Sequence, residues 1–174
     1  MKTDSTDREL IDFHERIDVE AKRLAGRHGE RLQCRRGCSD CCVDEVGIFE
    51  VEARRIRHEV GEGLLGEVAS PAGHCAFLDP QGACRIYSAR PYVCRTQGLP
   101  LRWIDYENAS EQRDICPLNE PGPDLLSLAP EFCWEIGPNE AELGYLESRR
   151  QGDSGVRGSL ERISLRDLFD ELSG

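Results

Sequence analysis

The chain has 174 residues, of which 33 are acidic and 22 are basic, so its formal net charge is -11 at pH 7. This charge argues against non-specific attraction to nucleic acids or to anionic membranes, and we expect neither as a partner. The length predicts a single domain over residues 1–174. No stretch reaches the ~20 apolar residues of a membrane span, and the start MKTDSTDREL lacks the apolar run of a secretory signal. We therefore expect a cytoplasmic protein.

The first part of the chain predicts two helices separated by a cysteine-rich loop. Leu10, Phe13, Ile17 and Leu24 recur at helical intervals, which predicts an amphipathic helix over residues 4–27, inside an N-terminal helical segment 1–30. Residues 31–44 carry four cysteines and no periodicity, so we expect a loop or single helical turns there. A second helix is predicted over residues 49–60.

The middle of the chain is rich in turn signals. Asp79-Pro80-Gln81-Gly82 predicts a β-hairpin over residues 75–87, whose turn would bring Cys75 and Cys84 together. Ser88 is a candidate cap for a short helix that runs through residues 91–95 and carries Cys94. A strand is expected over residues 99–106, followed by a Pro- and Gly-rich loop at 116–123.

The last part of the chain, residues 139–174, is predicted to be helical. Two helices fit residues 139–150 and 164–172, joined by a flexible segment at 151–158. Together these elements predict a small α+β protein that is mostly helical. We expect an irregular, cysteine-rich and metal-centred domain with one short β-hairpin.

Cysteine is the most informative residue type, because nine cysteines are unusual in a chain for which we expect no export. The nine are Cys34, Cys38, Cys41, Cys42, Cys75, Cys84, Cys94, Cys116 and Cys133. Disulfides are disfavoured in a reducing compartment. The alternatives are metal ligation, thiol redox chemistry and burial as small apolar side chains.

The spacing of the cysteines favours metal ligation for eight of them. Residues 34–42 have the pattern C-x3-C-x2-C-C, and short spacings of this kind allow several thiolates to face one centre, as in zinc and iron–sulfur sites. Cys75, Cys84, Cys94 and Cys116 supply four more thiols. The eight would suit either two four-thiolate sites or one cluster with spare thiols.

Two further features of the cysteine pattern are informative. The adjacent side chains of Cys41 and Cys42 should diverge, so we expect them to bind different metal atoms or one of them to point into the core. Cys133, between Phe132 and Trp134, is predicted to be a buried and inert thiol.

Basic residues and histidines give weaker signals. Six arginines lie beside the cysteines and could offset the charge of a thiolate site, or could be ordinary solvated side chains. They are Arg31, Arg35, Arg36, Arg85, Arg90 and Arg95. His74 could be a ligand but is predicted to be a surface residue. His14, His28 and His58 are expected on polar helix faces or at a helix end, without a special role.

Three strings carry a resemblance to a known family: Cys34-Arg-Arg-Gly-Cys38-Ser-Asp-Cys41-Cys42, Cys75-Ala-Phe-Leu, and Cys84-Arg-Ile-Tyr-Ser-Ala-Arg90-Pro91-Tyr-Val-Cys94-Arg95. Through them, residues 31–119 resemble the YkgJ-type cysteine-cluster family. That family has a zinc- or iron-chelating domain of the CxxCxxCC type, and its members are often described as iron–sulfur oxidoreductases. The resemblance implies a metal-binding region at 31–119. The chelating residues it implies are Cys34, Cys38, Cys41, Cys42, Cys75, Cys84 and Cys94, with Cys116 expected to join them.

Two functions from different classes follow. In the first, the thiolates hold an iron–sulfur cluster, most simply a 4Fe-4S cluster, for electron transfer or redox catalysis with an unknown protein partner. In the second, they hold zinc in a structural module that serves as a protein-interaction platform. Thiol redox chemistry, with Cys41 and Cys42 or Cys38 as the reactive thiols, is a third, weaker hypothesis. The sequence identifies no catalytic residue, and an oxidoreductase activity rests on the resemblance alone.

Overall fold

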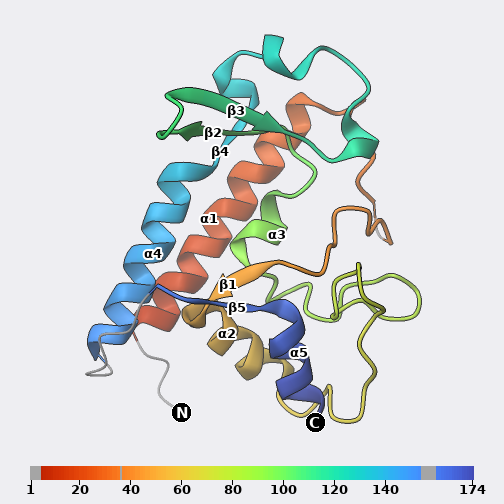
Figure 1. The fold of residues 1–174 in the computed structure, drawn as a ribbon, viewed down its shortest axis with the longest axis vertical. Coiled ribbons are helices and arrows are strands. Elements are labelled where there is room, and N and C mark those ends of the chain that lie inside the picture. Colours follow the sequence, from red (N-terminus) through yellow and green to blue (C-terminus); the bar gives the residue numbers. More distant parts are fainter. Residues whose placement is uncertain (1–4, 36, 154–159) are drawn as a thin grey trace.

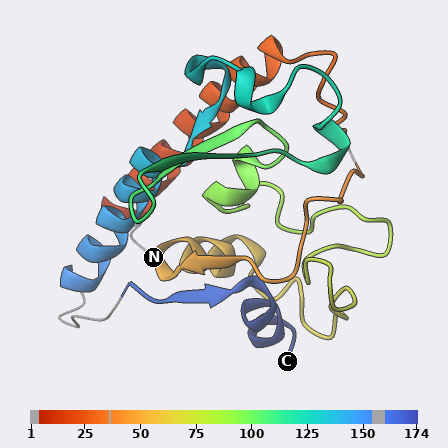
Figure 2. The ribbon, with the colours of Figure 1, turned by 45° about the horizontal axis from the view of Figure 1, so that its top comes forward.

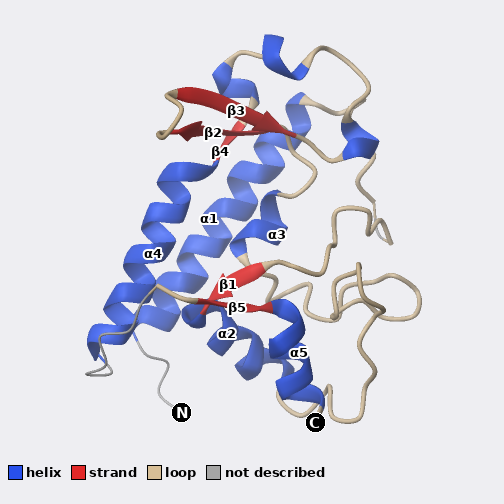
Figure 3. Cartoon of the chain, in the orientation of Figure 1, coloured by secondary structure: helices blue, strands red, loops and turns tan. Residues whose placement is uncertain are grey.

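The computed structural model describes residues 5–35, 37–153 and 160–174. In these ranges the chain forms five α-helices, which dominate the view in Figure 3. They are α1 (Ser5–Arg27), α2 (Glu50–Val60), α3 (Tyr92–Thr96), α4 (Ile136–Asp153) and α5 (Leu165–Ser173). None of these helices has both the length and the apolar character needed to cross a bilayer.

The strands form two small sheets. In the first, β1 (Gly47–Phe49) pairs antiparallel with β5 (Arg162–Ser164), with Ile48 opposite Ile163. In the second, β2 (Leu101–Asp105) lies between an antiparallel β3 (Ser110–Asp114) and a parallel β4 (Trp134–Glu135). Three short 3-10 helices, η1 (Pro117–Asn119), η2 (Leu125–Ser127) and η3 (Pro130–Phe132), connect β3 to β4. Figure 1 shows the second sheet at the opposite end of the molecule from α2 and α5.

One hydrophobic core forms around α1. Its buried positions, among them Leu10, Phe13, Ile17 and Leu24, follow a helical repeat and pack against α4 and Tyr92 of α3. Figure 1 shows α1 and α4 running side by side over most of their length. The predicted amphipathic helix is therefore confirmed, and its apolar side chains are part of this first core.

A second core forms around α5 and the loops that precede α3. Leu165, Leu168 and Phe169 of α5 are buried together with Ala76 and Phe77, and the rings of Phe77 and Phe169 meet edge to face at 5.3 Å. Cys75 belongs to the same core. Helix α2 contributes to both cores, because Val51 packs in the first and Ile56 in the second. The cysteine-bearing loops are thus fixed on one side by α2 and α5.

The α+β class is confirmed, and the local predictions differ from the structure in three places. The hairpin expected at 75–87 is a turn with a single bridge, Leu78 to Cys84, whereas β2 and β3 form the regular hairpin. Ser88 does not cap α3, because its hydroxyl donates to Glu59 and the N-cap residue of the helix is Pro91. The segment expected to be flexible begins inside α4, which continues to Asp153, and its remainder, 154–158, lies outside the described residues.

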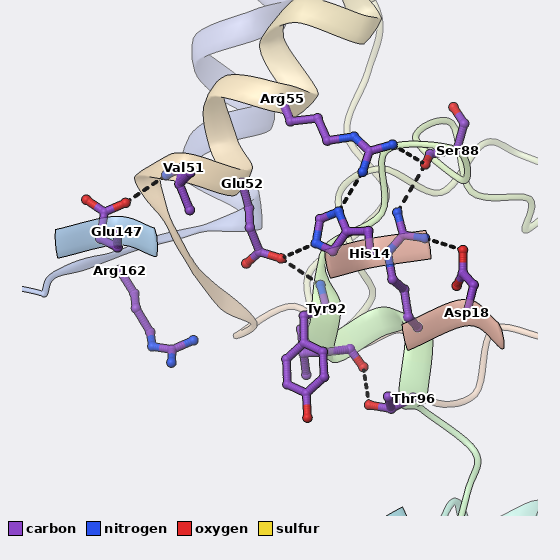
Figure 4. Close-up of polar contacts among 12 residues, drawn as sticks. His14, Asp18, Val51, Glu52, Arg55, Ser88, Tyr92, Thr96, Glu147 and Arg162 are labelled. Atoms are coloured by element: carbon purple, nitrogen blue, oxygen red, sulfur yellow. Dashed lines mark hydrogen bonds and ion pairs between the residues drawn. The ribbon is translucent and has the colours of Figure 1, made fainter. Parts of the chain in front are cut away.

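Buried polar groups hold α1, α2 and α3 together (Figure 4). His14 of α1 is 1% exposed, and its Nε2 lies 3.0 Å from Oε1 of Glu52 in α2. The same carboxylate oxygen accepts the backbone N–H of Tyr92 at the start of α3, at 2.7 Å. A guanidinium nitrogen of Arg55 lies 2.6 Å from Nδ1 of His14. Because arginine can only donate, Nδ1 accepts and Nε2 carries the proton, so His14 is neutral.

The expectation that His14 and His28 have no special role is wrong. His14 lies on the buried face of α1, since position 14 falls between Leu10 and Ile17 on the helical repeat, and the partner that satisfies it comes from another helix. His28 is 8% exposed and hydrogen-bonds the carbonyl of Phe132 at 2.7 Å. His58 is exposed, as expected.

A second buried carboxylate fixes the start of α2. Glu147 of α4 is 1% exposed and accepts the backbone N–H of Val51 at 2.8 Å. The N-terminal N–H groups of a helix have no partner within the helix, and a carboxylate there also interacts favourably with the helix dipole. Since Phe49 makes no side-chain cap, Glu147 takes that role from the neighbouring helix.

Burial lowers the pKa of His14 from its ordinary value near 6.5, and the charges of Arg95 and Arg55 add to this effect against the opposing influence of Glu52. The unfolded chain therefore binds a proton at His14 at a higher pH than the folded chain does. The contribution of His14 to the free energy of unfolding should be fully present above pH 6.5. It should decrease as the pH drops below 6.5, by at most about 1.4 kcal/mol per pH unit.

Denaturant unfolding between pH 7.5 and 5.5 should show that the free energy of unfolding falls more steeply with decreasing pH for the wild type than for His14→Gln. His58→Gln, which alters an exposed histidine, should retain the wild-type slope. Equal slopes for His14→Gln and wild type would contradict a neutral, buried His14.

Candidate metal site

Eight of the nine cysteines lie on three neighbouring parts of the chain. They are the loop between α1 and β1, the segment from the end of α2 through α3, and the turn that begins η1. Figures 2 and 3 show the first two as long loops on the same side of the molecule, beside α3 and α5. Their thiols range from exposed, at Cys34, to buried, at Cys75 and Cys116.

Asn119 joins Cys34 to the turn that carries Cys116. Its side chain is fully buried, and its Nδ2 lies 3.3 Å from the Cys34 sulfur and donates to the carbonyl of Gly98 at 2.8 Å. Its Oδ1 accepts the N–H of Gln33 at 2.7 Å, and its own N–H donates to the carbonyl of Cys116 at 2.8 Å. One amide side chain therefore fixes both cysteine-bearing segments at the same place.

Cys38 and Cys41 belong to the same neighbourhood. Two successive turns, closed by Cys38 N–H to Arg35 and Cys42 N–H to Ser39, fold the loop between Cys34 and Cys42. Burial raises the pKa of Cys116, and the charges of Cys41, Cys34 and Cys38 act in the same direction. We call Cys34, Cys38, Cys41 and Cys116 the Cys34 group.

Four other cysteines gather against the core around α5. The N–H of Cys75 donates to the carbonyl of Cys42 at 2.9 Å. The bridge from Leu78 to Cys84 and the bond from Arg85 N–H to the Phe77 carbonyl close the turn between Cys75 and Cys84. We call Cys42, Cys75, Cys84 and Cys94 the Cys42 group.

The thiols of the Cys42 group share one core. Cys75 is part of that core, and Cys42, Cys84 and Cys94 pack against it. Burial raises the pKa of Cys94, and the charges of Cys75 and Cys84 raise it further. Burial also raises the pKa of Cys75 and Cys84, so a metal that binds Cys75, Cys84 and Cys94 must displace their protons.

Cys133 lies apart from both groups. It is 7% exposed, next to η3 and β4, and burial raises its pKa. The side-chain charges that act on it belong to Arg113, Glu111, Arg102 and Arg31. The prediction of a buried Cys133 is confirmed, and its surroundings are those of an inert thiol.

The eight cysteines are suitable ligands for a thiophilic metal, although their thiols do not converge on one position. Within the described ranges, no group of three or more His, Cys, Asp or Glu side chains has an arrangement that could hold a metal ion. Cysteine thiolates are nevertheless the ligands that zinc sites and iron–sulfur clusters use, and this chain has eight of them on neighbouring segments. Cys94 lies in helix α3, and the other seven of these cysteines lie outside the helices.

The arginines beside the cysteines have different roles from one another. Arg31 is buried and donates to the carbonyls of Asn119, Pro123 and Glu120, while Arg95 is buried against Asp18 and the Ser88 carbonyl. Arg90, which also pairs with Asp18, lowers the pKa of Cys84 and Cys94 against the larger effect of their burial. Of the described arginines that the sequence analysis singled out, Arg90 is therefore the one whose charge acts on candidate metal ligands.

The remaining members of the predicted basic set do not form a cluster. Arg85 pairs with Glu67 at 2.9 Å, Arg35 is exposed, and Arg36 lies outside the described residues. His74 is exposed, as expected for a surface histidine.

Arg166 of α5 is a supporting residue that the sequence did not reveal. Its Nε donates to Asp44, two residues after Cys42, at 2.6 Å, and its terminal nitrogen donates to the carbonyls of Ser70 and His74. It thereby holds together the segments that carry Cys42 and Cys75. Asn119 and Gly98 were also missed, and a motif search limited to ligand residue types gives no signal for any of the three.

The thiol-redox hypothesis has little support from the surroundings of Cys41. The hydrogen bond that the Cys41 thiol donates to Cys42, together with burial, raises the pKa of Cys41. Reactive thiols need a lowered pKa, because the thiolate is the nucleophile. The arrangement favours a metal-binding role for this segment.

These features define a cysteine-rich region, and a comparison with protein families connects it with metal chelation. Residues 33–117 match the family CxxCxxCC, described as "putative zinc- or iron-chelating domain". The match agrees with the resemblance of this region to the YkgJ-type sequences. No curated protein and no solved structure matches the chain.

Gly98 gives a direct test of the packing around Cys34. Its φ is +91°, and a Cβ atom added there would lie 2.6 Å from the Cys34 sulfur. Gly98→Ala should therefore displace this thiol and weaken metal binding by ~10–100-fold, as measured by competition with a chelator. The backbone strain should also cost about 1–3 kcal/mol of stability.

Gly73→Ala is the matched control for this substitution. Gly73 has a φ of +90°, but a Cβ atom there would meet nothing within 4 Å. It should lose stability to a similar extent and retain its metal affinity. Equal metal affinity in the two variants would show that the contact between Gly98 and Cys34 does not matter for binding.

Proposed function

We propose that this protein uses its clustered cysteines to hold an iron–sulfur cluster for electron transfer. The observation that carries the proposal is that eight cysteines lie on neighbouring loops and on α3, while Cys133 is buried elsewhere. The family to which residues 33–117 belong supports zinc or iron as the metal. A cluster of the 4Fe-4S type would supply reversible one-electron chemistry and needs four thiolates.

The surroundings of the Cys42 group suit such a centre. Phe77, Ile86 and Phe169 are buried in the adjacent core and would keep water from one side of it. Arg90 would offset part of the negative charge of the thiolates. Burial and nearby charge are the levers by which a protein adjusts the potential of a cluster.

Access for an electron partner is available on the side of the Cys34 group. Cys34 is exposed, and Cys38 and Cys41 are half-buried. A partner protein could therefore approach the centre closely. The net charge of -11 gives no support to nucleic acid as that partner.

A structural zinc module is the second candidate. The feature in its favour is the scarcity of regular structure between α2 and α3, where 61–91 contain one isolated bridge and turns. Zinc in closed four-thiolate sites would stabilise such loops without redox chemistry. The surface would then serve to bind another protein.

Metal analysis of protein purified without oxygen, from cells supplied with both iron and zinc, separates these candidates. The proposal expects iron with acid-labile sulfide, broad visible absorption, and bleaching on reduction. Cys133→Ser should retain this metal and lose about 1–3 kcal/mol of stability through altered packing. Colourless protein that contains zinc and takes up no iron when supplied with iron and sulfide would reject the iron–sulfur proposal in favour of the zinc module.

A further inference from the structure

We infer that His14, Arg55 and Ser88 form a pH-sensitive switch: the segment around Ser88 is held in place while His14 is neutral and is released when His14 takes up a proton. His14 lies on α1, Arg55 lies on α2, and Ser88 lies in the loop before α3. The inference is separate from the proposed function, because none of these three residues is a candidate metal ligand.

Two hydrogen bonds to its carbonyl and one from its hydroxyl hold Ser88 in place. The carbonyl accepts from Nη2 of Arg55 at 3.4 Å and from Nη2 of Arg95 at 3.2 Å (Figure 4). The hydroxyl donates to Oε2 of Glu59 at 3.2 Å, and the other oxygen of Glu59 accepts from Arg55 at 3.2 Å. Two of these three contacts therefore depend on where the Arg55 guanidinium lies.

His14 fixes the position of Arg55 from inside the molecule. Nη1 of Arg55 lies 2.6 Å from Nδ1 of His14, and Nε2 of His14 lies 3.0 Å from Glu52. Nδ1 can accept a hydrogen bond only while His14 is neutral, because a protonated imidazole carries a proton on both nitrogens. Arginine keeps its own proton, so protonation of His14 would place two donors opposite each other. One of the two side chains would then have to move.

Arg55 is the side chain that is free to move. The His14 ring is 1% exposed and stays bound to the Glu52 carboxylate, which would attract a charged imidazole more strongly than a neutral one. The Arg55 side chain is 17% exposed, so its guanidinium can turn towards solvent. This movement would take one donor away from the Ser88 carbonyl.

The charges around His14 favour the same movement. The charged groups that act on its ring come from α2 and α3, and they are Glu52, Arg55 and Arg95. Asp18, which lies one helical turn after His14 on α1, pairs with Arg95. Glu147, the buried carboxylate of α4, binds the start of α2 instead. A protonated His14 therefore faces two guanidinium groups and one carboxylate, and the departure of Arg55 would remove one of the two repulsive charges.

The uptake of one proton sets the size of the response. Burial, with the charges of Arg95 and Arg55, lowers the pKa of His14 below its ordinary value of 6.5 while Arg55 is in place. A chain whose Arg55 has turned away binds the proton more readily. The population of this open form should therefore increase as the pH falls below 6.5, by at most about tenfold per pH unit.

A pH titration of the purified full-length chain from pH 7.5 to 5.0, followed by NMR, tests the switch. The ring nitrogens of His14 and the backbone amide of Ser88 should change with the same midpoint, below pH 6.5. The exposed His58 is an internal control, and its ring should titrate with a different midpoint from that of Ser88. Circular dichroism should show constant helix content through the Ser88 transition, which separates release of the segment from unfolding.

Three variants test the assignment of the residues. In His14→Gln the Ser88 amide should not change with pH, because this side chain takes up no proton. In Arg55→Gln the Ser88 amide should already have its low-pH position at pH 7.5, and His14 should titrate at a higher pH than in the wild type. His58→Gln should retain the wild-type behaviour of Ser88.

The wild-type titration decides the matter even where a variant fails to fold. A Ser88 amide that stays unchanged while His14 titrates would overturn the switch, and so would a His14 ring that stays neutral down to pH 5.0. Loss of helix content at the same midpoint as the Ser88 change would also overturn it, in favour of global unfolding. Metal content is measured separately, so each of these results leaves the proposed function untouched.

Discussion

The hydrogen bond between the Glu52 carboxylate and the Tyr92 N–H joins α2 to the start of α3. Glu52 lies on α2, the helix that packs in both cores, and its buried side chain also hydrogen-bonds His14 of α1. Helix α3 has five residues, too few to be stable alone, and it follows a long irregular loop. Its position, and with it that of Cys94, therefore depends on a carboxylate supplied by another helix.

The cysteine loops are held by a small set of side chains that bind backbone groups. Arg31 and Asn119 secure the loops around Cys34 and Cys116, and Arg166 secures those around Cys42 and Cys75. These contacts satisfy carbonyls and N–H groups that regular structure would otherwise satisfy. Such support fixes the course of the chain, and Asn119 also contacts the Cys34 sulfur directly.

Much of the fold could be predicted from the sequence, because long helices carry strong periodic signals. The helices α1, α2 and α5 lie within a residue or so of their expected bounds. The hairpin was predicted at 75–87, but the regular hairpin is formed by β2 and β3, later in the chain. Asp79-Pro80-Gln81-Gly82 does form a turn, but no paired strands flank it. His14 was misassigned because its buried partners come from α2, and a periodicity argument considers one helix at a time. The cysteines were identifiable by type and spacing, whereas their grouping depends on the contacts of Asn119 and α5.

The late position of α5 in the chain has a consequence for biosynthesis. Leu168 and Phe169 complete the core against which Cys75 packs, and β5, just before α5, is the partner strand of β1. Ribosomes deliver the cysteine loops well before these residues, so the nascent chain presents its thiols without the cover that α5 provides. Until α5 is made and packs, the Cys42 group lacks one side of its apolar surroundings, and its thiols are more accessible than in the folded chain.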